Sequence, residues 1–211
     1  QIEDILKDQS TYTNSGLDDT LIVKNKADEL ITQLFNSNLL NSKQLKYLTT
    51  FVPRCPLFYG LPKVHKVNNP LRPIVSQING PTCRINELVD KYLTTAESKI
   101  PFLLQDTTAY LRLIKNIQQV NSENFFLVTM DVSSLYTNIP HEEGVEWVSD
   151  FYEETLSDYV STTLPPIDKL TIKSLMLFIL RNCTFCFNDN FYTQLYGTTM
   201  GAKFSVKFAN I

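Results

Sequence analysis

The chain has 211 residues, of which 43% are hydrophobic and 11% aromatic, and its 19 Lys and Arg against 22 Asp and Glu give a formal net charge of −3. This length and apolar content suffice for one large domain or two small lobes, and they exclude a disordered chain, a collagen-like chain and a small disulfide-stapled domain. Taken alone, the acidic balance argues against a nucleic-acid partner, because such proteins usually carry excess Lys and Arg.

The hydropathy and the two ends of the chain indicate where the protein is located and whether the sequence is part of a longer protein. No run of about 18 apolar residues occurs, and Gln1–Asp4 does not begin a signal peptide. We therefore expect no transmembrane span and an intracellular location. Within the cell, the expected location is the nucleus rather than the cytoplasm. The chain starts with Gln and ends at Ile211 without a cap or polar tail, so we expect an excerpt of a longer protein.

The first half of the chain predicts helices on either side of a two-stranded ribbon. Six prolines between residues 51 and 81 exclude a helix interior there, whereas the flanking apolar residues recur at helical spacing. The expected elements are helices within residues 24–40 and over 43–48, strands over 57–66 and 71–77 joined by a turn at 68–70, and helices over 85–93 and 107–119.

The second half begins with an uninterrupted apolar run over residues 125–130, which is typical of a strand buried on both faces. The elements expected after it are helices over residues 141–159 and 168–181, a hairpin of 184–187 with 191–195, and a loop at 196–203 that enters a last helix. This order favours an α+β fold.

The charges are segregated along the chain. Residues 30–86 contain no carboxylate, whereas residues 142–158 contain seven carboxylates and no Lys or Arg. The first stretch should attract phosphates, although two solvated faces of opposite sign remain the alternative. Its cations are Lys63 and Arg72 on the expected ribbon and a candidate nucleic-acid surface of Lys43, Lys46, Arg54, Lys66 and Arg84.

Asp131 ends the apolar run and precedes two serines, where a carboxylate could hold a hard cation. The alternative is an N-cap for the following turn. Lys63, Lys66 and Arg72 suit the clamping of a polyphosphate, with a generic surface hairpin as the alternative. The loop at residues 196–203 has two glycines and is by itself a weak signal for phosphate binding or close backbone approach.

Other chemistries find little support in the sequence. Cys183 and Cys186 have zinc-ligand spacing without a second pair, so all four cysteines are expected to be reduced and mostly buried thiols. His65 and His141 are too few and too far apart to indicate a metal site. A Ser-His-Asp hydrolase is excluded because no Gly-x-Ser-x-Gly motif occurs.

Three segments together are specific: residues 58–66 with 71–76, residues 127–141, and residues 197–203. In this order they resemble the reverse transcriptase of Penelope-like retroelements, from about residue 40 to the end of the chain. The resemblance implies part of a right-handed polymerase fold. Its expected parts are an N-terminal helical segment in residues 1–50, a fingers-like lobe with the cationic hairpin in 51–120, and a partial palm-like lobe in 121–211.

The resemblance also assigns roles to single residues. Lys63 and Arg72 match fingers residues that grip the incoming deoxynucleoside triphosphate (dNTP). Asp131, with the Val132 carbonyl, matches the first catalytic and metal-binding aspartate. The remaining matches are Tyr136 for the aromatic gate that excludes a ribose 2′-hydroxyl and Met200 with Gly201 for the motif that packs on the nascent base pair and template. The implied cofactor is a pair of Mg²⁺ ions about 4 Å apart, and the implied partners are an RNA template and a DNA primer.

The chain departs from the family's pattern near its end. Ser205–Lys207 stands where the family usually has Ala-Pro-Ser, and no second carboxylate motif follows it before Ile211. Asp18 and Asp19 form the one Asp-Asp pair and are expected to be turn residues. Because one carboxylate cannot hold two Mg²⁺ ions in the needed geometry, we expect this excerpt to be inactive in polymerisation.

Three functions are therefore open. The leading prediction is the fingers and partial palm of a retrotransposon reverse transcriptase, which is an RNA-directed DNA polymerase and a nucleotidyltransferase in its complete form. The alternative is a non-catalytic nucleic-acid-binding remnant that uses the cations of residues 43–84. The third is a globular fragment with no activity.

Overall fold

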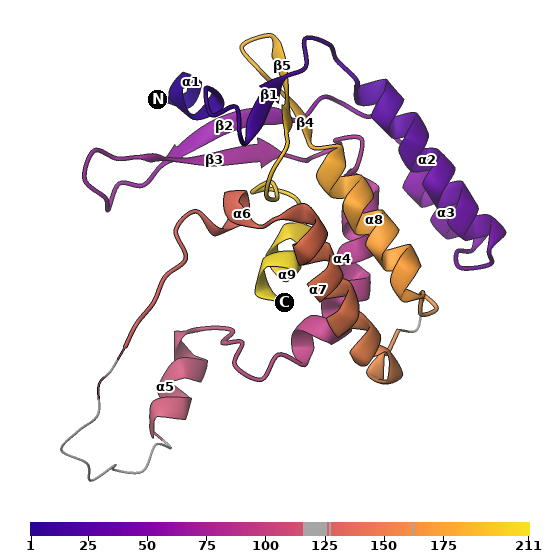
Figure 1. Cartoon of the computed structure of the whole chain (residues 1–211). Helices are drawn as coiled ribbons and strands as arrows, with labels where there is room; N and C mark the ends of the chain where they lie inside the picture. Colours follow the sequence, from indigo (N-terminus) through magenta and orange to yellow (C-terminus); the bar gives the residue numbers. More distant parts are fainter. Residues whose placement is uncertain (116–125, 127, 162) are drawn as a thin grey trace.

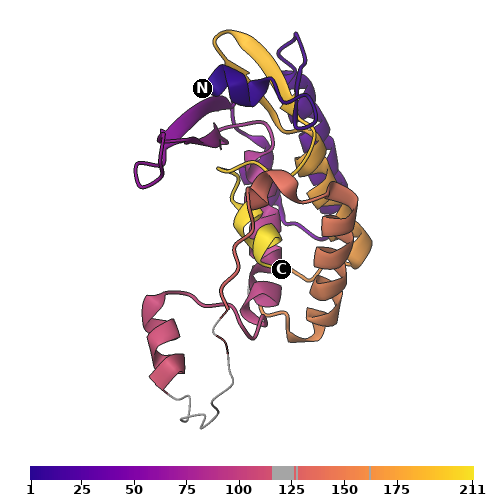
Figure 2. The same ribbon diagram turned by 60° about the vertical axis from the view of Figure 1, so that its left-hand side comes forward.

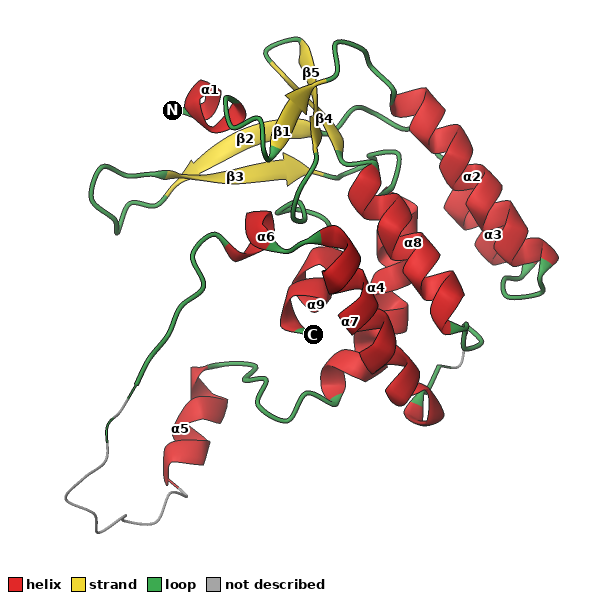
Figure 3. Ribbon diagram, viewed as in Figure 1, coloured by secondary structure: helices red, strands yellow, loops and turns green. Residues whose placement is uncertain are grey.

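The structure, a computed structural model, describes residues 1–115, 126, 128–161 and 163–211. Its fold is α+β, with a five-stranded mixed sheet on one side of a layer of helices (Figure 1, Figure 3). In the described ranges the helices are α1 (Ile2–Leu6), α2 (Thr20–Asn36), α3 (Ser42–Thr49), α4 (Cys83–Ser98), α5 (Thr107–Lys115), α6 (Leu135–Asn138), α7 (His141–Glu154), η1 (Leu156–Asp158), α8 (Lys169–Arg181) and α9 (Phe204–Asn210). The strands are β1 (Tyr12–Asn14), β2 (Leu57–Pro62), β3 (Leu71–Ser76), β4 (Thr184–Phe187) and β5 (Asn190–Gln194).

The sheet joins strands from distant parts of the chain. Its order is β1-β5-β4-β2-β3, and all neighbours are antiparallel except β2 and β4, which run parallel with Leu57 opposite Cys186. The two hairpins expected from the sequence therefore share one sheet. Five described strands with both pairing senses agree with the α+β fold class.

The β2–β3 hairpin forms as predicted and projects from the rest of the molecule (Figure 2). Leu61 pairs with Arg72, and the Lys63 N–H then donates to the Pro70 carbonyl at 2.9 Å, but Pro70 has no N–H to return the bond, so the ladder ends there. Asn68 and Asn69 take positive φ of 63° and 42° in the connecting turn, a conformation that Asn tolerates better than most residues. The expected strand over 57–66 is thus shorter than predicted.

The larger core lies among the helices. Asp168 caps α8 by accepting a hydrogen bond from the Thr171 N–H at 2.9 Å, and the apolar side chains of α8 then recur at helical spacing. They pack with apolar side chains of α4 and α7, and the same cluster takes residues from α2, α3 and α9. Its largest fully buried members are Tyr92, Tyr152 and Phe204. The helices predicted over 43–48, 85–93 and 168–181 are confirmed.

A smaller core lies against the sheet. Phe185 is fully buried, its ring centre lies 5.1 Å from that of Phe58, and Tyr12 meets both rings edge to face. The 3-residue strand β1 and the helix α1, which carries the buried Leu6, complete this cluster. Neither β1 nor α1 was predicted. The hairpin of β4 and β5 around residues 188–190 was predicted and is confirmed.

Several predicted elements differ in extent. The helix expected within residues 24–40 begins earlier, at Thr20, and ends at Asn36. The helix expected over 141–159 ends at Glu154 and is followed by η1. The helix expected over 107–119 is found as α5 up to Lys115, and residues 116–119 lie outside the described residues. None of the described helices has the length and apolar content needed to cross a membrane.

The strand expected over residues 125–130 is not found in its described part. Phe125 and Leu127 lie outside the described residues, whereas Phe126 and Val128–Met130 belong to no strand. Phe126 and Met130 are each 92% exposed, so the expected burial on both faces is wrong for them. The physical reason is pairing: a strand is buried only when neighbouring strands bond its backbone groups, and the five described strands offer this segment no ladder.

Candidate functional site

A cavity of about 650 Å³ lies between the β2–β3 hairpin and the segment that leads into α6. We call it the hairpin cavity. It brings together all seven residues that the resemblance assigns to catalysis, metal binding or dNTP binding, although they come from segments that are far apart in sequence. Its lining is Lys63, Lys66, Arg72, Ile74, Asp131, Val132, Ser133, Ser134, Leu135, Tyr136, Met200, Gly201, Ser205 and Val206.

The hairpin supplies three cations to one wall of the cavity. Lys63 is half-buried at the end of the ribbon, where its N–H donates to the Pro70 carbonyl at 2.9 Å, and Lys66 and Arg72 are exposed. Within the described ranges none of these three side chains forms an ion pair. Their positive charge is therefore available to an anion such as a polyphosphate.

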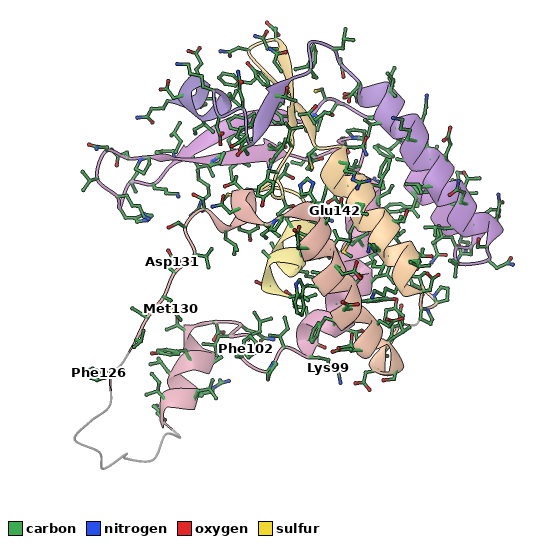
Figure 4. The ribbon with its side chains drawn as sticks, viewed as in Figure 1. Lys99, Phe102, Phe126, Met130, Asp131 and Glu142 are labelled. Carbon is green, nitrogen blue, oxygen red and sulfur yellow. The ribbon has the colours of Figure 1, made fainter. Side chains whose placement is uncertain are left out.

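Asp131 supplies the carboxylate of the cavity. It is exposed and lies at the end of the extended segment that approaches α6 (Figure 4). The N-cap residue of α6 is Ser134, which adopts a left-handed conformation with φ of 51°, so the capping alternative for Asp131 is not the one found. A non-glycine residue held in this conformation costs free energy and is more frequent at ligand sites than elsewhere.

The cavity suits one Mg²⁺ ion better than two. In the described part of the chain, no group of three or more His, Cys, Asp and Glu residues is placed to hold a metal. Mg²⁺ nevertheless often binds through one or two carboxylates, its own waters and the phosphates of a substrate. Asp131 on one side and the hairpin cations on the other fit such an arrangement, with the phosphates between them.

The loop at residues 196–203 is tied to the rest of the cavity by backbone contacts. The Val75 N–H on β3 donates to the Met200 carbonyl at 2.9 Å, and the Thr198 N–H donates to the Tyr136 carbonyl at 2.6 Å. Gly201 has φ of 128°, and a Cβ there would overlap the Val75 carbonyl oxygen, so only glycine fits. The loop thus couples the hairpin to α6.

Ser205 joins α9 to the loop at residues 196–203. Its side chain is buried, and its hydroxyl oxygen lies 2.5 Å from the Thr198 hydroxyl oxygen, so the first turn of α9 is bonded to the loop. Ser205 also lines the hairpin cavity. A hydroxyl at this position therefore fastens the loop that carries Met200 and Gly201.

Of the five residues of the candidate nucleic-acid surface, Lys66 lines the hairpin cavity and the other four lie outside it. Lys43, Lys46 and Arg54 are exposed outside the hairpin cavity. Arg84 is packed instead: its guanidinium lies 4.2 Å from the centre of the Tyr47 ring and pairs with Glu87 at 3.1 Å. Burial raises the pKa of Glu87, but hydrogen bonds from Lys203, Tyr47 and Arg84 lower it by more, so the net shift of this pKa is downward. Arg84 is thus engaged within the protein.

Some residues of the site were missed by the sequence reasoning. Ile74, Leu135 and Val206 line the cavity but are ordinary apolar residues in the sequence. His141 contacts the 196–203 loop, although its sequence position suggested no role. All four cysteines are free thiols, as expected, but only Cys183 is buried, and the other three are partly exposed. Burial raises the pKa of Cys183 to about 12.

Comparison with known proteins gives no relative: no protein-family model, no curated protein and no solved structure matches this chain.

Proposed function

We propose that the hairpin cavity binds a dNTP together with Mg²⁺, and that the chain supplies the fingers and part of the palm of an RNA-directed DNA polymerase similar to those of Penelope-like retroelements. One observation carries the proposal. Residues chosen from three separate sequence segments, for complementary chemical roles, line a single cavity.

Different lining residues would contact the triphosphate, the sugar and the base of the substrate. Lys63 and Arg72 neutralise the triphosphate, and Asp131, with the Val132 carbonyl, holds Mg²⁺ against it. Tyr136 faces the sugar, and Met200 with Gly201 offers a flat surface to the nascent base pair. In a complete polymerase two Mg²⁺ ions activate the primer 3′-hydroxyl and stabilise the leaving pyrophosphate. The RNA template and DNA primer would then lie across the mouth of the cavity.

Triphosphate binding to this chain tests the cationic wall. We expect calorimetry in the presence of Mg²⁺ to show dNTP binding that Arg72→Ala or Lys63→Ala weakens about tenfold or more, because charge-assisted hydrogen bonds contribute about 1.5–3 kcal/mol. Lys46→Ala is the matched control, since Lys46 is an exposed cation outside the cavity. No dNTP binding by the parent protein, or equal weakening by all three substitutions, would contradict the proposal.

Metal dependence tests Asp131. The parent protein should bind dNTP more tightly with Mg²⁺ than without it, and Asp131→Asn should lack this gain. Without metal the variant should bind at least as tightly as the parent, because a negative charge beside the phosphates has been removed. A Mg²⁺ effect that is the same in both proteins rules out Asp131 as the ligand.

The second candidate is a nucleic-acid-binding protein without catalysis. It is favoured by the exposed cations Lys43, Lys46 and Arg54 and by the lack of a metal-holding cluster in the described residues. Replacing all three cations by Ala should weaken binding to an RNA–DNA duplex and reduce the dependence of log K on log salt by roughly 2–3, since each phosphate contact contributes about 0.7–0.9. Binding that salt does not affect would exclude this candidate.

A further inference from the structure

We propose that His141 is a positioning residue for the sugar side of the hairpin cavity. It lies outside the cavity lining, yet it holds the loop that supports the backbone of Tyr136. Through this support it sets the preference of the cavity for deoxyribose over ribose. The inference rests on the proposed function, because it assigns a role within a dNTP site.

The contact of His141 with the loop is direct. His141 is half-buried and is the first residue of α7, and its Nε2 lies 2.6 Å from the Gly197 carbonyl oxygen. Because a carbonyl oxygen only accepts, Nε2 carries the proton and donates it. The imidazole also stacks on Tyr196, with ring centres 6.3 Å apart and planes 16° apart, so its orientation is held on two sides.

A second tie joins the same two segments from the other end. The Thr198 N–H donates to the Tyr136 carbonyl at 2.6 Å, next to the Gly197 that His141 binds. Gly197 has φ of 70°, and a Cβ there would overlap both the Tyr136 carbonyl oxygen and the backbone of Thr137. Residues 136–141 therefore grip residues 197 and 198 at two points, and no side chain intervenes between the two backbones.

The position of Tyr136 depends on this grip because α6 is too short to hold itself. It has four residues and no side-chain hydrogen bond at its N-cap. A helix of this length is unstable alone and takes its position from outside contacts. When the His141 bond is lost, residues 136–141 keep one of their two hydrogen bonds to the loop, and the Tyr136 ring can move away from the sugar.

Loss of the His141 bond should change the binding of the sugar and leave the binding of the phosphates unchanged. Lys63 and Arg72 lie on the hairpin wall, and β3 is bonded to the loop at Met200, which His141 does not contact. The phosphates should therefore bind as before. Discrimination against a 2′-hydroxyl is steric, so a small displacement of the Tyr136 ring admits the larger sugar while hardly changing affinity for the smaller one.

The test measures Kd for a dNTP, for the matching ribonucleotide and for tripolyphosphate, all with Mg²⁺. We expect His141→Ala to lower the ratio of ribonucleotide Kd to dNTP Kd about fivefold to tenfold, which is the fold-change that the loss of one hydrogen bond typically causes. The Kd for tripolyphosphate should be unchanged. His141→Gln, whose Nε2 can donate to the same carbonyl, should restore most of the preference. Tyr136→Ala removes the gate itself and gives the largest loss of preference against which His141→Ala is compared.

Gln44→Ala is the matched control. The Gln44 Nε2 donates to the Thr163 carbonyl at 2.7 Å, which is a tie of the same kind, and neither residue lines the hairpin cavity. This variant should leave the sugar preference unchanged, whatever its effect on the melting temperature. A change in preference as large as that of His141→Ala would show a general loss of stability and overturn the inference.

The remaining outcomes separate the two proposals. A parent protein that binds no dNTP overturns the proposed function, and this inference with it. If the parent binds dNTP, the inference alone is overturned by any of three results: no preference for dNTP in the parent, an unchanged preference in His141→Ala, or a loss of tripolyphosphate affinity in that variant.

Discussion

Gly197→Ala should destabilise the protein far more than Gly16→Ala, although the two glycines have nearly the same backbone conformation. Their φ angles are 70° and 69°. A Cβ at Gly197 would overlap the backbone of Tyr136 and Thr137, whereas a Cβ at Gly16 meets no atom within 4 Å. The pair therefore separates the cost of conformation from the cost of crowding.

The magnitudes follow from these two costs. A left-handed residue with a Cβ costs about 1–2 kcal/mol, of which the stiffer unfolded chain returns about 0.4–1 kcal/mol. Gly16→Ala should thus lower the free energy of unfolding by roughly 0–1.6 kcal/mol. Crowding typically adds about 1–3 kcal/mol at Gly197, and the atoms in the way are backbone atoms, which cannot rotate aside. At about 2–4 °C per kcal/mol, the Gly197 variant should melt roughly 2–12 °C below the Gly16 variant.

Two measurements check this prediction. Thermal melts followed by circular dichroism give the difference in stability, and dNTP titration shows whether the loop has moved. Under the proposed function, Gly197→Ala should weaken dNTP binding because its loop carries Met200 and Gly201, and Gly16→Ala should not. Equal melting temperatures for the two variants would refute the reasoning, since crowding against α6 would then cost nothing.

Two further predictions concern stability. Asp168→Ala should cost about 1 kcal/mol in urea unfolding at neutral pH, because the carboxylate caps α8, whereas Asp19→Ala should cost little, since Asp19 makes no side-chain bond at the start of α2. Hydrogen bonds from Thr171 lower the pKa of Asp168 below its ordinary value of 3.8. The carboxylate therefore stabilises the fold above pH 3.8, and this stabilisation is lost as the pH falls through the lowered folded-state pKa. A stability difference between parent and Asp168→Ala that stays constant on acidification would contradict this. Phe185→Ala should cost about 3–5 kcal/mol, because Phe185 is fully buried, whereas Leu57→Ala, at a 54% exposed position, should change stability by less than about 0.5 kcal/mol. Similar losses in both would place Phe185 outside the core.

The helices and hairpins that were predicted correctly have signals within a few residues. In α8 an Asp precedes a run of apolar residues at helical spacing, and the structure shows the cap and the buried face. In the β2–β3 hairpin, prolines exclude a helix and the polar residues 68–70 supply the turn. Such signals suffice because a helix or a tight hairpin is bonded mostly to itself.

The errors occur where an element depends on a distant partner. Residues 125–130 have the composition of a buried strand, but their described members form no ladder and are exposed. The 3-residue strand β1 has no periodicity to read and exists because it pairs with β5, about 180 residues away in the sequence. Pairing of this kind is a property of the whole chain, so no local pattern predicts it.

The sequence by itself determined the α+β class, most helices, the cationic hairpin and the free cysteines. Its resemblance to a known family supplied the prediction of which residues bind dNTP. Only the tertiary structure decided that Lys63, Asp131, Tyr136 and Gly201 share one cavity, and that His141 and Gly197 support it. The bond between the last two spans 56 positions. Spacing, capping and charge act over a few residues and are visible in the sequence, whereas a cavity exists only after distant segments have been brought together against the entropy of the loops between them.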